Sequence, residues 1–401
     1  MTVPTTTSIA NLNLAITALQ TQLKNRAPQA RLDRKIPSPT IDTMRSAGLC
    51  RVYTPRRFGG LELPMQEVLP LVARVAEACP ASAWVLAIYQ IHNWVIALMT
   101  ERAQSEVFAN NPDPLVCASL NPSKNAAIKT SAGYLIERGR FTFCSGAAAR
   151  EWALLGVLVK NSAGEVVDVG CCLVPGNVLS EIDDWQVSGL RATGSISLVA
   201  DNLEVPAHRF LSYSDATAYR TPGALVNLGV VYRAAFVPML VLNLAGPALG
   251  AARFALASFV DNLRSKGTAA GTYPLPGVAK VDAAAAHAVI ATAEMQIASA
   301  ELLLDHAGKT IRVAAEAGES LTPAASAKIN LETSYAVREC LHAVQALFLQ
   351  AGGGVLQPDH PLQAAYQDIL AINCHGFLGH EANLALYGSL LTGHAHPQAF
   401  L

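Results

Sequence analysis

Apolar residues recur at helical spacing along the first part of the chain. One face of the first expected helix consists of residues three or four positions apart: Leu12, Ile16, Leu19 and Leu23. Residues 53–60 contain a proline and two glycines, which predict a turn. Further helical patterns follow at about 64–77, 80–99 and 101–109. We therefore expect a helical domain over residues 1–113.

The pattern changes after about residue 114 to short runs rich in Val, Ile, Leu, Thr and Phe, separated by Gly, Asn, Ser and Asp. Runs of this composition predict β-strands. The expected strands are 134–137, 141–144, 153–160, 166–174, 186–190 and 195–202. A spacing of about ten residues is typical of a small antiparallel barrel or sandwich, so we expect a β domain over residues 114–212.

Long patterns rich in Ala and Leu return after a polar connection around residues 212–230. They cover about 233–264, 280–317, 323–351 and 361–391. Four long helices with short links predict an antiparallel four-helix bundle, here over residues 213–401. The expected fold class is mainly α with a β middle domain: N-terminal helices, an antiparallel β barrel or sandwich, and a C-terminal bundle.

Residues 234–252 form a stretch of 19 positions without a charge, which is long enough to raise the question of a membrane helix. The stretch contains Pro238, Asn243 and Pro247, and the patterns around it are amphipathic. These features favour a buried helix of a large core. We therefore expect no membrane partner.

Composition and charge narrow the class of protein. The chain has 401 residues, 51% hydrophobic and 15% charged, which suffices for a large core. A formal net charge of -1 without a run of Lys and Arg argues against a nucleic-acid partner. The Thr-rich N-terminus lacks a signal-peptide pattern, and the eight cysteines show no CxxC spacing. We expect a cytoplasmic protein with reduced thiols.

Two segments offer hydrogen-bonding groups to a ligand, although no dinucleotide or P-loop glycine motif is present. Ser145 and Gly146 follow an expected strand, where a hydroxyl and a missing side chain let a ligand ring approach the backbone. Thr193, Gly194 and Ser195 form a second loop, whose amides and hydroxyls suit the edge of a heterocycle or a phosphate. An ordinary turn and a hairpin loop would explain the same residues.

His375 is the third candidate. It lies seven positions after Asp368 in the last helical pattern, so both are expected on one helical face, and Gly376 leaves room for a ligand. A single helical histidine can equally be a structural or surface residue. His375 and His380 are five positions apart and face different ways, so the spacing predicts no metal site.

Several motifs occur in register along nearly the whole chain. They are Pro55-Arg-Arg-Phe-Gly-Gly60, Ala83-Trp84, His92-Asn-Trp94, Phe143-Cys-Ser145-Gly146 with Trp152, Asp184-Trp185, Gly189-Leu-Arg-Ala-Thr193-Gly194-Ser195 and Gln367-Asp368-Ile369 before His375. In this order they resemble the flavin-dependent monooxygenase branch of the acyl-CoA dehydrogenase superfamily. The helical, β and four-helix layout of that superfamily matches the order of domains expected above.

The resemblance implies the oxygenase component of a two-component enzyme. A separate reductase would supply FMNH2 or FADH2, to which O2 would add as a C4a-hydroperoxyflavin. The substrate hydroxylated would be aromatic, phenolic or polyketide-like. The sequence leaves open FMN against FAD, the reductase, the substrate, and whether a carbon, nitrogen or sulfur atom is oxidised.

The resemblance also implies roles for individual residues. Those expected at the flavin are Ser145, at its N5 and C4a edge, Thr193, Gly194 and Ser195, along the ring or ribityl chain, and Trp152, as a wall. Those expected from an adjacent subunit are Arg264, Gln350, Gly352 and Gly353, which implies a homotetramer. His92 and His375 would serve the substrate, one of them as a base for its hydroxyl.

Two alternatives stay open at this point, because the chain departs from the family pattern. Ala147 to Ala149 and Arg150 stand where relatives often carry a histidine, Ala364 and Gln367 replace the usual arginines, and Phe141 replaces a common tryptophan. The alternatives are a flavin-dependent acyl-CoA (thioester) dehydrogenase and a non-catalytic family member. Against the dehydrogenase, the chain lacks the Tyr-x-Gly-Thr segment that accompanies the catalytic carboxylate of acyl-CoA dehydrogenases.

Overall fold

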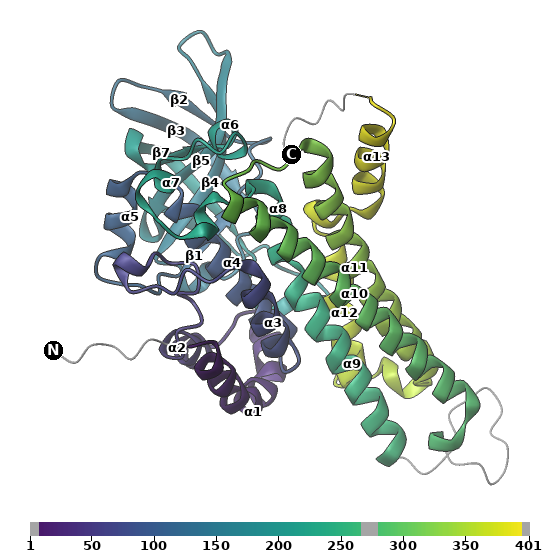
Figure 1. Cartoon of the computed structure of the whole chain (residues 1–401). Helices are drawn as coiled ribbons and strands as arrows, with labels where there is room; N and C mark the ends of the chain where they lie inside the picture. The colour runs from purple at the N-terminus through teal and green to yellow at the C-terminus, as the bar shows by residue number, and fades with distance from the viewer. Residues whose placement is uncertain (1–7, 266–279, 395–401) are drawn as a thin grey trace.

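A computed structural model describes residues 8–265 and 280–394. Its helices are α1 (Ile9–Asp33), α2 (Ser38–Ser46), α3 (Met65–Ala76), α4 (Pro80–Ala97), α5 (Glu101–Phe108), α6 (Tyr213–Thr217), α7 (Pro222–Val226), α8 (Phe236–Asn243), α9 (Ala245–Ser265), α10 (Ala284–Ala317), α11 (Pro323–Gln350), α12 (Pro361–Asn373) and α13 (His380–Leu391). In Figure 1 the sheet and the N-terminal helices lie on one side, and the long bundle helices lie on the other. The expected order of helices, sheet and helical bundle is confirmed.

The middle of the chain forms one sheet of eight strands, in the order β6-β7-β3-β2-β4-β5-β8, with β1 paired to β4. The strands are β1 (Val116–Ser119), β2 (Ala126–Lys129), β3 (Gly133–Phe141), β4 (Trp152–Lys160), β5 (Val166–Pro175), β6 (Ser180–Ile182), β7 (Ser197–Pro206) and β8 (Phe210–Ser212). Most pairings are antiparallel, as expected, but β1 and β2 both run parallel to β4. The sheet is therefore mixed.

Two of the expected strands are wrong. Residues 186–190 form a loop, because Leu190 has φ 51°, in the left-handed region that an extended strand cannot adopt. The run 141–144 does not form a separate strand either. Only Phe141 belongs to β3, which stops there, and residues 142–144 form a loop in which Phe143 has φ 63°. Loop residues therefore follow β3 and precede β7 at these two places.

The helical bundle is more broken than its sequence pattern indicates. The first expected helix divides into α8 and α9 at Leu244, three positions before Pro247. The last divides into α12 and α13, separated by a 3-10 turn at Gly376–Leu378. Gly376 and Gly379, which begin and follow this turn, lower the helical propensity, which explains the break.

α4 is the central helix of the core, because every residue from Pro80 to Ala97 is buried. One face packs against β1 and another against α9. A helix that is apolar on all sides must be enclosed by other elements. α4 therefore fixes the distance between the sheet and the bundle.

The helical stretch Phe236–Ser265 is, within the described ranges, the one that is long and apolar enough to cross a membrane. Its most apolar window is 83% buried inside the structure. Packing against the other helices of the core accounts for its composition.

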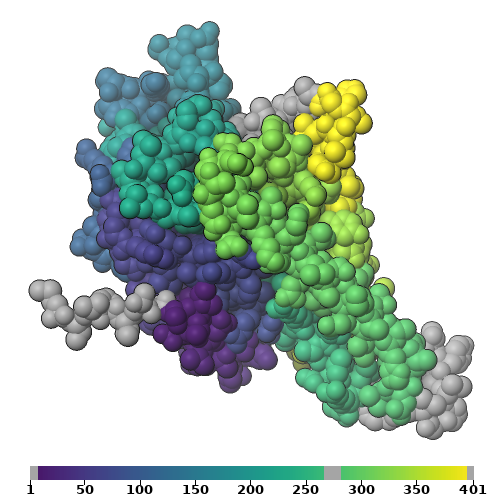
Figure 2. Space-filling model, viewed as in Figure 1, coloured from purple at the N-terminus to yellow at the C-terminus, as the bar shows by residue number. Residues whose placement is uncertain are grey.

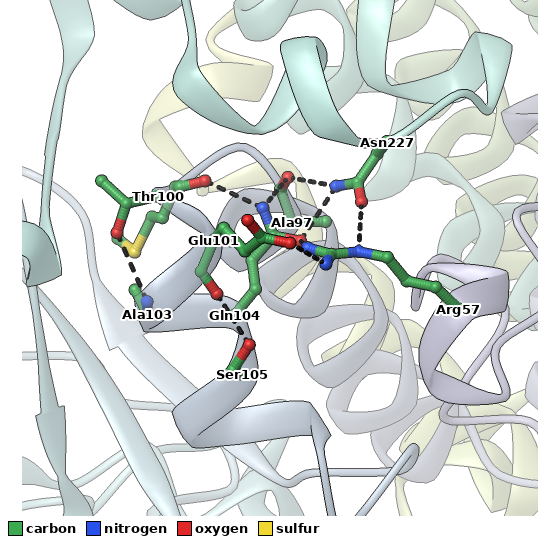
Figure 3. A network of polar contacts seen from close by, with 9 residues as sticks. Arg57, Ala97, Thr100, Glu101, Ala103, Gln104, Ser105 and Asn227 are labelled. Atoms are coloured by element: carbon green, nitrogen blue, oxygen red, sulfur yellow. Dashed lines mark hydrogen bonds and ion pairs between the residues drawn. The ribbon is translucent and has the colours of Figure 1, made fainter.

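Arg57 joins the turn at residues 53–60 to the connection that follows the sheet (Figure 3). Its Nε donates to Asn227 Oδ1 at 3.0 Å, and its two terminal nitrogens donate to Glu101 Oε1 at 2.7 Å and Gln104 Oε1 at 2.9 Å. Gln104 and Asn227 in turn donate to the carbonyl of Ala97 at the end of α4. The Pro-Arg-Arg-Phe-Gly-Gly motif therefore has a structural role here.

A glycine substitution tests the packing of the bundle on the N-terminal helices. A Cβ at Gly250 of α9 would lie 2.0 Å from the carbonyl oxygen of Ala73 on α3. Gly250→Ala should therefore lower the free energy of unfolding by about 1–3 kcal/mol. Gly388→Ala on α13 is the control, because its Cβ meets nothing within 4 Å. It should stabilise the helix slightly, by up to about 1 kcal/mol. Thermal denaturation followed by circular dichroism measures both, and equal midpoints for the two variants would contradict the contact.

Candidate functional site

Ser145 and Gly146 form a turn that hydrogen bonds connect to the loop before β7. The amide of Cys144 donates to the carbonyl of Ile196 at 3.1 Å, and the amide of Gly146 donates to the carbonyl of Thr193 at 2.8 Å. Gly146 has φ 73°, and a Cβ there would lie 2.5 Å from the hydroxyl of Tyr89. This position therefore requires glycine.

Three hydroxyl groups meet at this contact. Ser145 Oγ lies 2.8 Å from Ser195 Oγ, which lies 2.6 Å from Thr193 Oγ1. Thr193 Oγ1 also donates to the carbonyl of Leu190 at 2.9 Å. We call Ser145, Ser195 and Thr193 the hydroxyl cluster. The sequence singled out both segments, and the structure brings them together across 50 positions.

The buried helix α4 holds the turn from the other side. Trp84 Nε1 donates to Ser145 Oγ at 3.0 Å, and the hydroxyl of Tyr89 donates to the carbonyl of Gly146 at 2.7 Å. Both donors come from one helix whose position is fixed by packing on all sides. These two hydrogen bonds from α4 thus add to the backbone contacts that position the turn.

Asp368 of α12 fixes the loop that carries Thr193 and Ser195. Its Oδ1 accepts from the amide of Leu190 at 2.7 Å, and Arg31 Nη1 lies 3.3 Å from the same oxygen. Burial raises the pKa of Asp368, and the charge of Arg31 opposes that shift. A Cβ at Gly189 would lie 1.9 Å from the carbonyl oxygen of Gln367, so the loop touches α12 directly.

His375 does not lie within a helix, which corrects the expectation that it shares a helical face with Asp368. α12 ends at Asn373, and His375 precedes the 3-10 turn, where its Nδ1 accepts from the amide of Phe377 at 3.3 Å. Its ring packs edge-on against Trp84, with the centroids 5.7 Å apart. Burial lowers the pKa of His375 to about 4. The ring is therefore neutral near pH 7 and carries its proton on Nε2.

His92 is buried on α4, and its Nδ1 lies 2.7 Å from the carbonyl oxygen of Val116. A carbonyl oxygen only accepts, so Nδ1 carries the proton and Nε2 keeps a lone pair. Burial lowers the pKa of His92 to about 4, below the value near 6.5 expected of an ordinary imidazole. The Nε2 atoms of the two histidines thus have opposite hydrogen-bonding roles: that of His92 accepts and that of His375 donates.

Trp152 lies at the start of β4, beside Arg209. The guanidinium of Arg209 covers its ring at 5.3 Å and is itself held by Glu106 of α5 at 2.7 Å. The aromatic residue next to Ser145 is Phe143, whose side chain is 70% exposed and packs edge-on against Trp185 at 6.0 Å. Sequence reasoning assigned no role to Phe143, because its positive φ of 63° and its exposure are features of the folded chain.

The residues expected to serve an adjacent subunit lie on the surface of the bundle. Arg264 is exposed at the end of α9, and Gly352 and Gly353 are exposed after α11, where Gln350 is half-buried. Asn262 near Arg264 contacts His360 at 3.4 Å, so both segments lie near one end of the bundle. Figure 2 shows the bundle as an arm that projects beyond the sheet and the N-terminal helices.

The structure explains two of the departures from the family pattern. Gln367 accepts from Arg31 Nη2 at 2.8 Å, so α1 supplies the guanidinium that α12 lacks. Arg150 donates to the carbonyls of Gly176, Ala147 and Leu179 and pairs with Glu181, so it holds neighbouring loops together. Sequence reasoning missed Arg31, since it lies 337 positions from Asp368.

Two further features concern metal ions and the molecular surface. No group of three or more His, Cys, Asp or Glu side chains is placed to hold a metal ion in the part of the chain that the structure describes. A surface hollow of about 730 Å³ lies between the turn at residues 53–60 and α10, lined by residues that include Arg56, Glu62, Leu228 and Arg312. None of its lining residues belongs to the hydroxyl cluster.

Comparison with protein families gives matches at both ends of the chain. Residues 12–109 match the acyl-CoA dehydrogenase N-terminal domain, and residues 242–379 match the acyl-CoA dehydrogenase C-terminal domain. The two matches flank the sheet and together cover the helical parts of the fold.

Individual proteins are similar over nearly the full length. The FADH(2)-dependent resorcinol hydroxylase oxygenase component of Rhizobium sp. (strain MTP-10005) is 28% identical, with 92% of this chain and 91% of that protein covered. The flavin-dependent monooxygenase oxygenase subunit HsaA of Mycobacterium tuberculosis is also 28% identical, with coverages of 94% and 93%.

The solved structure of the 3-HSA hydroxylase from Rhodococcus sp. RHA1 superimposes with a TM-score of 0.92 at 26% identity, covering 98% of this chain and 99% of that one. Fold, family matches and relatives agree with the resemblance drawn from the motifs, and the similar proteins are named as oxygenase components of flavin-dependent enzymes. The chain belongs to the acyl-CoA dehydrogenase superfamily.

Proposed function

We propose that the chain is the oxygenase component of a two-component flavin-dependent monooxygenase. It uses reduced FMN or FAD from a separate reductase, together with O2, to hydroxylate an aromatic, phenolic or polyketide-like molecule in the cytoplasm. The observation that carries the proposal is the arrangement around Trp84, which donates to Ser145 on one side and packs against the neutral ring of His375 on the other. The relatives named as oxygenase components support it.

The residues around Ser145 fit a reduced isoalloxazine. Ser145 offers a hydroxyl oxygen at the edge of the cluster, and the exposed ring of Phe143 beside Trp185 offers an apolar wall. When bound, reduced flavin supplies the electrons that activate O2. Thr193, Gly194 and Ser195 line the same loop, so they would hold the ring or its ribityl chain, whereas Phe143 suits the role of wall better than Trp152.

The two histidines suit a phenolic substrate. The lone pair on His92 Nε2 can accept the hydrogen bond of a substrate hydroxyl. This bond gives the hydroxyl phenolate character and raises the electron density on the substrate ring carbon that is attacked. The Nε2 proton of His375 can donate to an oxygen. With pKa values of about 4, neither ring gains a proton near pH 7, so both act through hydrogen bonds and weak basicity.

A second subunit would complete the site. Arg264, Gln350, Gly352 and Gly353 lie on the projecting arm, where a guanidinium and flexible backbone amides could reach the phosphate of a flavin in a neighbouring chain. The long helices also expose large apolar side chains, among them Met295, Leu302, Leu349 and Leu391. Such side chains support burial against other copies in a homotetramer.

The structure gives little support to the thioester dehydrogenase alternative. That reaction needs a free carboxylate to abstract a proton. Asp368, the carboxylate hydrogen-bonded to the loop of the hydroxyl cluster, is already bound by Leu190 and Arg31. It therefore serves to position the loop.

Stopped-flow spectroscopy tests the proposal. Protein mixed anaerobically with chemically reduced FMN or FAD, and then with oxygenated buffer, should show a transient absorbance that differs from both reduced and oxidised flavin. Immediate reoxidation without a transient would contradict the oxygenase function. Bleaching of bound oxidised flavin by a thioester would favour the dehydrogenase, and failure to bind any flavin would favour a non-catalytic role.

His92→Asn tests the role of the buried imidazole. The amide nitrogen of asparagine lies close to the position of Nδ1 and can still donate to the carbonyl of Val116, but the variant lacks the basic Nε2. Hydroxylation of a phenolic substrate should fall by about 10²-fold or more, whereas the affinity for reduced flavin should stay the same. The wild-type contribution of both histidines should not change between about pH 6 and 8, since they titrate near 4.

His287→Gln is the matched control. His287 also contacts a backbone carbonyl, that of Val281 at 2.6 Å, but it is exposed on α10. Its replacement should leave hydroxylation unchanged. Equal rates for the His92 and His287 variants would rule out a role for His92 at the substrate.

A further inference from the structure

The hydrogen bonds of the hydroxyl cluster run in one direction. At one end, the carbonyl of Leu190 can only accept, and Thr193 Oγ1 lies 2.9 Å from it. Two acceptor oxygens at that distance repel each other unless a proton lies between them, so the Thr193 hydroxyl donates to Leu190. At the other end, the indole nitrogen of Trp84 can only donate, and it donates to Ser145.

These two ends determine which oxygen donates in each hydrogen bond between them. The single proton of Thr193 points to Leu190, so the bond of 2.6 Å between Thr193 and Ser195 must use the proton of Ser195. The bond of 2.8 Å between Ser195 and Ser145 must then use the proton of Ser145. Ser145 therefore accepts from Trp84, donates to Ser195, and keeps one lone pair.

Ser145 can offer that remaining lone pair to a ligand, but it has no proton left to donate. The cluster is buried, with Thr193, Ser195 and Ser145 only 1%, 4% and 7% exposed, so water cannot easily replace a missing partner. If all of these hydrogen bonds ran in the opposite direction, the oxygens of Thr193 and Leu190 would face each other with lone pairs and no proton between them. The Ser145 hydroxyl is thus an acceptor toward a ligand, and its direction is determined through Ser195 by Thr193.

This polarity matches one oxidation state of a flavin. N5 of a reduced flavin carries a proton and donates, whereas N5 of an oxidised flavin has a lone pair and accepts. We propose that Ser195 and Thr193 orient the Ser145 hydroxyl so that the site selects reduced over oxidised flavin. They act as positioning residues, and the inference rests on the proposed function, since it assumes that N5 lies at Ser145.

The ratio of dissociation constants for oxidised and reduced flavin tests the inference. FAD is used, with FMN in parallel, and binding is followed anaerobically by fluorescence or ultrafiltration. Ser195→Ala frees the proton of Ser145, which can then donate to oxidised N5. The ratio should fall by about tenfold, the effect of roughly one hydrogen bond, mainly because the oxidised form binds more tightly.

Ser197→Ala is the matched control. Ser197 is a buried serine two positions after Ser195, at the start of β7, but its hydroxyl donates to Asp184 at 2.5 Å and takes no part in the cluster. Its loss should leave the ratio unchanged. Thr193→Val is a second test variant, because it frees the proton of Ser195 and lets the chain reverse. It should lower the ratio in the same direction if Ser195→Ala fails to fold.

A flavin analogue separates polarity from general damage to the site. In oxidised 5-deaza-FAD a C–H group replaces N5, so the repulsion between lone pairs is absent. Wild-type protein should bind oxidised 5-deaza-FAD about tenfold more tightly than oxidised FAD. In Ser195→Ala this difference should disappear, which a merely structural role for Ser195 would not produce.

The outcomes separate the two hypotheses. If wild-type protein binds neither oxidised nor reduced flavin, the proposed function fails. If wild-type protein binds reduced flavin but the ratio is the same in wild type, Ser195→Ala and Thr193→Val, the proposed function stands and the polarity inference is wrong.

Discussion

The candidate site depends on the buried carboxylate of Asp368. It holds the amide of Leu190 at 2.7 Å, and Arg31 of α1 neutralises its charge. The carbonyl of the same Leu190 accepts from Thr193, so one residue connects the ion pair to the hydroxyl cluster. Three distant parts of the chain, α1, α12 and the loop before β7, are thereby fixed to each other. A charge buried in this way is costly without its partner, which makes the arrangement selective for one geometry.

The fully buried helix α4 supplies the second constraint. Trp84, Tyr89 and His92 all direct polar atoms from this helix to the β part of the fold. Because α4 is buried on every side, it cannot turn or slide without exposing hydrophobic surface or breaking these hydrogen bonds. The groups that would contact flavin and substrate are therefore positioned before any ligand binds, which lowers the entropic cost of binding.

The sequence predicted the elements better than their contacts. Hydrophobic periodicity located α3, α4 and α5 to within about two residues, because their apolar faces repeat regularly. It failed at residues 186–190 and at the break before His375, where backbone conformation rather than apolar pattern decides. Motif resemblance pointed to Ser145, Thr193, Ser195 and His375. It could not predict the pairing of Arg31 with Asp368, since nothing local to either residue marks a contact across 337 positions.

The crystal structure of the protein grown anaerobically with reduced flavin would test the central claim most directly. The account predicts that flavin N5 lies about 3 Å from Ser145 Oγ, within hydrogen-bond distance, with Trp84 donating to the same oxygen and Phe143 against the ring. A flavin bound elsewhere, for example in the hollow beside Arg56 and Arg312, with the hydroxyl cluster untouched, would contradict it.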